Sequence, residues 1–120
     1  MKLLIVLITY NRLKYTKLTL KNLIGSIECP YYLVIVDNHS TDGTVRWLEN
    51  NGPQDMLIKN SYNAYPGAAC NMGWRAGIQE FDATHLMRCD NDMEFVKGFD
   101  KKAAEDRKST RLNSSHANIS

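Results

Sequence analysis

Short runs of apolar residues, each followed by a polar cluster, recur along the first hundred positions of the chain. They lie at 3–8, 32–36, 56–58 and 84–89. The first two are apolar or aromatic at every position, which is typical of strands buried on both faces of a parallel sheet. We therefore predict four strands at these positions.

The segments between these runs carry apolar residues at helical spacing. We predict one helix that ends near Ile27, a second over 45–51 that is capped by Ser40 or Asp42, and a third over 66–79. The third helix has small residues four positions apart, which would let it lie close to the sheet. They are Ala69, Gly73 and Gly77. Strands that alternate with helices indicate an α/β fold, and its strands are parallel because the connections are crossovers.

Length and composition are those of one small globular domain, with 120 residues, 43% of them hydrophobic and 23% charged. The longest apolar run, 3–8, is far shorter than the about 20 residues that span a bilayer. Cys29, Cys70 and Cys89 lack a CxxC spacing, which argues against a disulfide framework and a thiolate zinc site. We expect a cytoplasmic chain, with peripheral association with the inner face of the membrane as an open alternative.

The last part of the chain, 106–120, differs from the rest. It holds three basic residues and one acidic residue, which account for the net charge of +2, so we predict no nucleic-acid partner. It has no apolar period, and Asp106 to His116 reads codon for codon as the translation of a common sequencing adapter. We therefore expect 1–105 to be the native unit and 106–120 a disordered, non-native tail. The natural gene would then continue past about Glu105, and a natural polar tail is the alternative.

Polar clusters follow three of the four predicted strands. These are Thr9-Tyr10-Asn11, Asp37-Asn38 and Asp90-Asn91-Asp92. In an open α/β sheet, ligands bind outside the carboxyl ends of the strands, so we predict that the three clusters form one ligand site. Each cluster taken singly also has a structural interpretation as a turn or a loop cap.

Asp90 and Asp92 are the strongest candidates for metal ligands. Two neighbouring carboxylates repel each other unless a cation or a raised pKa relieves them. Hard oxygen ligands suit Mg²⁺ or Mn²⁺, which bind through one or two carboxylates together with substrate phosphates. A solvated acidic turn is the alternative.

Several familiar catalytic motifs are missing from the sequence. The glycine-bearing stretch 67–73 has neither the Gly-Lys-Ser/Thr of a phosphate-binding loop nor the GxGxxG of a dinucleotide site, and no HExxH or GxSxG occurs. We interpret His39 and His85 as structural and Trp47 and Trp74 as core residues. ATP hydrolysis and NAD chemistry therefore lose support.

Taken together, these segments resemble the donor-binding half of the family 2 glycosyltransferases, which have the GT-A fold. The resemblance rests on 9–12, on 34–44, on 60–77 and on 90–92 as the DxD motif, and it covers 3–100 in order. It implies a Rossmann-like, mainly parallel sheet flanked by helices and incomplete at the C-terminus. It also implies transfer of a sugar from a nucleotide-sugar donor to an acceptor hydroxyl, generally with inversion.

The resemblance further implies roles for individual residues. Thr9 and Tyr10 would line the nucleobase pocket, and Asp37 would accept a hydrogen bond from the base, typically uracil. Asp90 would contact the ribose or a bound water, and Asp92 would coordinate the Mg²⁺ or Mn²⁺ that holds the donor diphosphate. The donor-binding candidates are Thr9, Tyr10, Asn11, Asp37, Asn38, Asn71, Asp90 and Asn91, with Asp92 and Asp90 as metal ligands.

Two features depart from the family pattern. Many members carry Arg immediately before the Asn of the RNxG-like segment, where this chain has Cys70 before Asn71. The acceptor half and the general base that takes the acceptor proton would lie beyond Phe99, so the sequence names no catalytic base. We expect a donor- and metal-binding fragment that is inactive by itself, with an acceptor that is a glycan, a lipid or a protein.

Three other functions are weighed against this one. A sugar nucleotidyltransferase normally has a glycine-rich basic loop after the first strand, and 9–12 is not such a loop. A phospho-acceptor receiver domain has paired acidic residues there, whereas this chain has Tyr10 and Asn11. A non-catalytic module that binds nucleotide-sugars would share every residue named above and stays open.

Overall fold

The computed structural model describes residues 1–106 and 118–119, and the strands among them form a single sheet. The strands are β1 (Leu3–Thr9), β2 (Tyr31–Asp37), β3 (Met56–Lys59), β4 (His85–Asp90) and β5 (Asn118–Ile119). Their order across the sheet is β3-β2-β1-β4-β5. The first four run parallel, and β5 pairs antiparallel with β4. The central strand is therefore β1, the most apolar run of the sequence.

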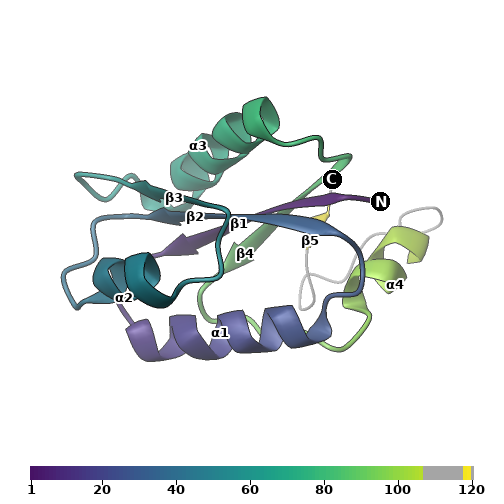
Figure 1. Ribbon diagram of the computed structural model, residues 1–120, viewed down its shortest axis with the longest axis horizontal. Helices are drawn as coiled ribbons and strands as arrows, with labels where there is room; N and C mark the ends of the chain where they lie inside the picture. Colours follow the sequence, from purple (N-terminus) through teal and green to yellow (C-terminus); the bar gives the residue numbers. More distant parts are fainter. Residues whose placement is uncertain (107–117, 120) are drawn as a thin grey trace.

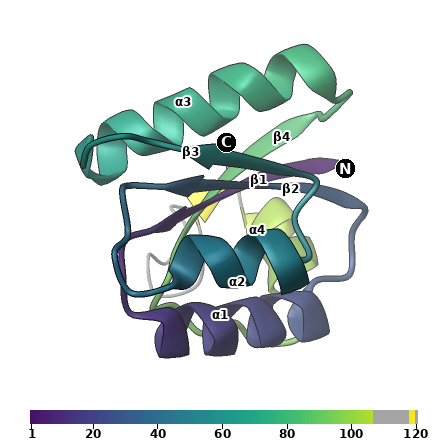
Figure 2. The same ribbon diagram turned by 60° about the vertical axis from the view of Figure 1, so that its left-hand side comes forward.

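Helices cover both faces of this sheet (Figure 1). They are α1 (Leu13–Ser26), α2 (Thr44–Asn51), α3 (Tyr65–Glu80) and α4 (Phe99–Asp106). Figure 2 shows α3 on one face and α1, α2 and α4 on the other, so that the sheet forms the middle of three layers. Among the described residues, no helix is both long and apolar enough to cross a membrane.

Alternate residues of the central strands supply the two cores. Leu3, Ile5 and Leu7 of β1 pack in the cluster beneath α1, α2 and α4. Leu4 and Val6 belong to the cluster on the α3 face. All five of these side chains have 0% exposed surface. The uninterrupted apolar run therefore reflects burial on both faces, as the sequence predicts.

The approach of α3 to the sheet depends on its glycines. A Cβ atom on Gly73 would lie 2.6 Å from Cγ1 of Val6, and one on Gly77 would lie 2.7 Å from Cδ1 of Leu4. Carbon atoms in favourable contact are about 3.5–4.0 Å apart, so any larger residue would push the helix away from the sheet. This confirms the close packing predicted from the spacing of Ala69, Gly73 and Gly77.

The four predicted strands and three predicted helices are all present, and each predicted end lies within one residue of the observed one. The helix α4 was not predicted, because it offers few apolar positions. Two of them, Phe99 and Ala103, are buried against the α1 side of the sheet. The buried carboxylate of Asp100 also anchors this helix, since it accepts hydrogen bonds from the amides of Glu28 and Cys29 (3.1 and 2.6 Å to Oδ2).

The predicted disorder of 106–120 falls mostly outside the described residues. Asp106 is the last residue of α4, and Asn118–Ile119 form β5. β5 pairs with β4 through the backbone, which any residue but proline can do at an open strand edge. The non-native origin of this segment stays a prediction.

Candidate functional site

The strand register brings the three polar clusters to one edge of the sheet. Thr9 at the end of β1 pairs with Asp37 at the end of β2. On the other side of β1, Ile8 pairs with Asp90 at the end of β4. The loops that follow these strands therefore start beside one another at the carboxyl edge, which is where a parallel α/β sheet binds its ligands.

Asp37 is the centre of a buried hydrogen-bond network. Its side chain is 1% exposed, and Oδ1 accepts hydrogen bonds from the hydroxyls of Thr9 (2.7 Å) and Ser40 (2.6 Å). Oδ2 accepts a third from the amide of Ser40 (2.8 Å). Thr9 itself is 0% exposed. Both residues thus connect the end of β1 to the loop after β2.

Asn38 links this network to the start of α3. Its amide donates to the carbonyl of Thr9 (2.9 Å), and its side-chain Oδ1 accepts from Nδ2 of Asn60 (3.0 Å) and from the amide of Ala64 (3.3 Å). The residue is 1% exposed. Asn38 therefore holds the loop before α3 against the carboxyl edge, which is a structural role.

The turn between β1 and α1 is held by side chains of the loop that follows β2. Asn11 and Arg12 have left-handed backbones, with φ of 54° and 56°. The amide of Asn11 donates to Oγ of Ser40 (2.7 Å), while its Oδ1 accepts from the amide of Thr41 (2.7 Å). These reciprocal bonds stabilise an unusual backbone, since non-glycine residues seldom adopt positive φ.

Asp42 completes the connection between the two loops. Its Oδ2 accepts from the amide of Leu13 (3.1 Å), and its Oδ1 accepts from the amide and hydroxyl of Thr44 (3.1 and 2.6 Å). Partial burial raises the pKa of Asp42, but these hydrogen bonds outweigh that effect and hold the pKa below its usual value. The prediction that Ser40 or Asp42 is the N-cap of α2 is wrong, because Gly43 takes that position with a φ of 92°. Asp42 lies one residue earlier and bonds to Thr44, the first residue of the helix, while Ser40 bonds to Asp37.

The acidic turn after β4 has a different character. The side chain of Asp90 is 44% exposed and that of Asp92 is 51% exposed. Each carboxylate faces an arginine at a long distance, 3.4 Å from Arg88 to Asp90 and 3.6 Å from Arg12 to Asp92. Charge-assisted hydrogen bonds are usually about 2.7–2.9 Å long, so both contacts are loose. Their oxygens are therefore accessible to a ligand.

Asn91 connects this turn to the region where β1 ends and α1 begins. Its Nδ2 donates to the carbonyl of Asn11 (3.3 Å) and to the hydroxyl of Thr16 on α1 (3.2 Å). The amide side chain thus positions the backbone between the two aspartates, and both of its contacts are with the β1–α1 region.

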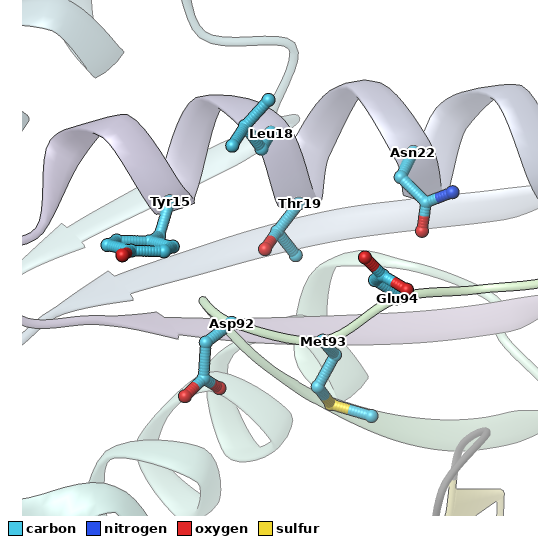
Figure 3. A pocket seen from close by; sticks show the side chains of 7 residues that line it. All are labelled: Tyr15, Leu18, Thr19, Asn22, Asp92, Met93 and Glu94. Carbon is cyan, nitrogen blue, oxygen red and sulfur yellow. The ribbon is translucent and has the colours of Figure 1, made fainter.

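A cavity of about 390 Å³ lies beside this turn. Figure 3 shows that α1 lines one side and the segment 92–94 the other. Its lining residues are Tyr15, Leu18, Thr19, Asn22, Asp92, Met93 and Glu94. The cavity is lined by carbon-rich side chains and by two carboxylates, and it shares Asp92 with the candidate metal site.

The donor atoms on this turn suit a hard divalent cation that keeps other ligands. Asp90 and Asp92 offer exposed carboxylate oxygens. No group of three or more His, Cys, Asp or Glu side chains that could enclose a metal occurs within the described part of the chain. Mg²⁺ and Mn²⁺ fit such a sparse set, because they retain waters and substrate phosphates as ligands.

The remaining predicted residues lie around this edge. Tyr10 directly follows β1 and is 48% exposed, so its ring is free to stack on a ligand. Asn71 is an exposed residue of α3. Its neighbour Cys70 is 2% exposed, and burial raises the pKa of its thiol to about 11. Cys70 is therefore neutral near neutral pH and adds no charge to this edge of the sheet.

Sequence reasoning did not find four residues that shape this site. They are Arg12, Ser40, Asn60 and Arg88. Ser40 stands three residues after Asp37, a spacing typical of local turns, so its bond to that carboxylate had a recognisable signal. Arg88 also had a signal, as a charged residue within a strand otherwise rich in apolar residues.

Comparisons with known proteins agree with this architecture. The sequence model of a family described as glycosyl transferase family 2 matches residues 4–113. No curated protein matches the sequence. Among solved structures, S. aureus TarS 1-349 is 25% identical with a TM-score of 0.69, and the match covers 88% of this chain and 32% of TarS.

Two further matches contain nucleotide-sugars. S. aureus TarS 1-349 in complex with UDP-GlcNAc is 25% identical with a TM-score of 0.70, over 88% of this chain and 30% of that one. A mannosyltransferase from Pyrobaculum calidifontis in complex with GDP-Man and Mn²⁺ is 21% identical with a TM-score of 0.70, over 86% and 31%. The chain thus spans about a third of the length of these structures, and they share its α/β sheet.

Proposed function

Because the chain belongs to glycosyl transferase family 2, we propose that it forms the donor-binding part of an enzyme that transfers a sugar from a nucleoside diphosphate sugar to an acceptor hydroxyl. One observation carries the proposal for this chain. The ends of β1, β2 and β4 lie side by side, and the exposed carboxylates of Asp90 and Asp92 stand at that edge. A nucleotidyltransferase or a receiver domain is not favoured, because the family match covers nearly the whole chain.

In this proposal the nucleobase lies near the ends of β1 and β2. Tyr10 stacks on the base with its exposed ring. Oδ2 of Asp37 has accepting capacity beyond the Ser40 amide, which supports a hydrogen bond from a uracil N–H. Asn11 and Asn38 fix the loops around the base, and Asn71 faces the donor from α3. The complexes of TarS with UDP and UDP-GlcNAc support a UDP-linked donor, while the GDP-Man complex keeps a guanine nucleotide as the alternative.

The sugar diphosphate would lie at the turn after β4. Asp92, with Asp90, would hold Mg²⁺ or Mn²⁺ there, and Asp90 would also contact the ribose directly or through water. When bound, such a cation neutralises the charge that develops on the departing diphosphate. The Mn²⁺ in the mannosyltransferase complex supports this choice of cofactor.

Transfer also needs an acceptor and a general base. We propose no residue of this chain for that base, and the acceptor is a glycan, a lipid or a protein. The chain spans about a third of the matched structures, so we expect the 120 residues to bind the donor without transferring the sugar. If the acceptor is a lipid, we also propose that the whole protein associates peripherally with the membrane.

Calorimetric titration of the 120-residue chain with UDP, with GDP and with added Mn²⁺ tests the proposal. We expect UDP to bind in the presence of Mn²⁺ and to be released by EDTA. Asp92→Ala should weaken metal-dependent binding by about tenfold or more, because a direct ligand of the cation is lost. Glu80→Ala is the matched control, since this exposed carboxylate ends α3 far from the carboxyl edge.

Two results would contradict the proposal. One is a folded chain that binds neither UDP nor GDP when Mn²⁺ is present. The other is nucleotide binding that is unchanged by EDTA and by Asp92→Ala, which would place the donor away from the acidic turn.

A further inference from the structure

Arg88 is a charged residue of β4 that lies in the sheet between Val6 of β1 and Asn118 of β5. The register aligns it with Val6 of β1, which in turn aligns with Val34 of β2. Both valines are 0% exposed and pack beneath α3. The side chain of Arg88 is 35% exposed, although it occupies the next place in the same row. The two valines show that an apolar side chain suits the α3 face of this row, so packing alone does not require the guanidinium.

The guanidinium of Arg88 lies at the carboxyl edge beside α3. Its Nη2 atom is 3.4 Å from Oδ1 of Asp90, the last residue of β4. Its positive charge also acts on the thiol of Cys70 on α3, where it opposes the rise in pKa that burial causes. The aliphatic part of the side chain thus runs under α3, while the charged end reaches toward the proposed donor site, as long basic side chains commonly do.

The contact with Asp90 does not account for this placement. A distance of 3.4 Å between half-exposed groups makes a loose ion pair, and such pairs contribute little to stability. Elsewhere in the chain, Lys2 approaches Asp82 to 2.7 Å. Within the described part of the chain, Arg88 therefore keeps most of its hydrogen-bonding capacity for another anion. If Asp90 and Asp92 hold a divalent cation, as proposed above, Asp90 also no longer needs Arg88 as a counter-charge.

The balance of charge identifies that anion. The acidic turn and its two arginines, Arg12 and Arg88, carry no net charge together. A divalent cation adds two positive charges, and the diphosphate of a nucleoside diphosphate sugar adds two negative ones. The planar guanidinium group matches phosphate oxygens with two parallel N–H donors.

We infer that Arg88 is a donor-binding residue whose guanidinium contacts the diphosphate of the nucleotide-sugar. The inference rests on the proposed function and deepens it, because it assigns the diphosphate to the side of the site between β4 and α3. Cys70 on this side is buried and uncharged, so it adds no charge of its own beside Arg88.

Binding of UDP and of uridine to the 120-residue chain tests this inference, with Mn²⁺ present throughout and NMR titration as the measurement. Arg88→Leu is the principal variant, since leucine suits a place beside Val6 and should leave the unfolding midpoint at or above that of the original chain. We expect it to weaken UDP binding by about tenfold or more and to change uridine binding by less than about twofold, because uridine has no phosphate. Arg88→Lys should recover part of the loss, since it keeps the charge without the planar donors.

Arg75→Leu is the matched control, because Arg75 is an exposed arginine on α3. It should bind UDP as the original chain does. UDP binding by Arg88→Leu that equals that of the original chain would overturn the inference and leave the proposed function standing. An equal loss of UDP and uridine binding would overturn it too, since Arg88 would then shape the base pocket. If the original chain binds no nucleotide, the proposed function fails and the inference fails with it.

Discussion

The strands on either side of β1 both end in an aspartate, and the two aspartates have opposite surroundings. Asp37 ends β2, is 1% exposed and accepts three hydrogen bonds from Thr9 and Ser40. Asp90 ends β4, has a 44% exposed side chain and meets Arg88 at 3.4 Å. Thus Asp37 belongs to a buried hydrogen-bond network, whereas Asp90, at the equivalent end of β4, lies in an exposed turn.

The difference separates the candidate site into two halves with different roles. In the half formed by β1 and β2, the polar side chains satisfy backbone groups of two loops and hold an unusual turn in place. In the half formed by β4, the charged side chains have weak partners that a ligand can replace. Substitutions of the buried polar residues in the first half should therefore cost more stability than substitutions in the second half, whose main effect should be on binding.

The largest effect is expected for Asp37→Ala. It leaves the hydroxyls of Thr9 and Ser40 and the amide of Ser40 without their acceptor in a buried place. The free energy of unfolding should fall by about 2–4 kcal/mol. Urea unfolding followed by tryptophan fluorescence measures this loss. A decrease as small as that of an exposed aspartate would show that the network contributes little to stability.

A smaller loss is expected for Asp42→Asn, and it should depend on pH. Hydrogen bonds hold the folded pKa of Asp42 below its ordinary value of 3.8, so its contribution is complete above that value and is lost as the pH falls through the folded pKa. At neutral pH the variant should be less stable by about 0.5–1 kcal/mol. The difference between the two chains should disappear in acid, where the aspartate is protonated. A difference that persists there would assign the loss to packing.

The smallest effect on stability is expected for Asp90→Asn. Its exposed carboxylate has one loose ion pair, so the free energy of unfolding should change by less than about 0.5 kcal/mol. The same urea titration provides the measurement, with Asp37→Asn as the matched substitution at the other strand end. A large loss in Asp90→Asn would contradict the division of the site into two halves.

The sequence predicts most of the fold because strands buried on both faces appear as uninterrupted apolar runs. Uninterrupted apolar runs mark β1 and β2, and the spacing of Gly73 and Gly77 indicates the close approach of α3. By contrast, α4 buries Phe99 and Ala103 and depends on the carboxylate of Asp100, whose partners are amides some seventy positions earlier in the chain. Long-range polar anchors of this kind have no local pattern.

The sequence predicts where the candidate site lies, but not the surroundings of its individual residues. Alternation of strands and polar clusters indicates the carboxyl edge, and the register places Thr9, Asp37 and Asp90 there. Sequence alone does not distinguish the two aspartates, because their burial depends on which loop folds over them. Ser40 covers Asp37, whereas the turn after β4 leaves Asp90 open. The pairing of each acidic residue with Arg12 or Arg88 likewise depends on the tertiary structure.

Hydrogen exchange of the 120-residue chain, with and without UDP and Mn²⁺, tests the division of the site most directly. The account predicts that the amides of Asn38, Ser40 and Asn60 are protected in the free chain, because each is hydrogen-bonded there, and that ligand changes them little. The amides of 91–94 should exchange rapidly in the free chain and become protected when ligand binds. Protection that rises around Asn38 and Ser40 while 91–94 stays unchanged would contradict the account.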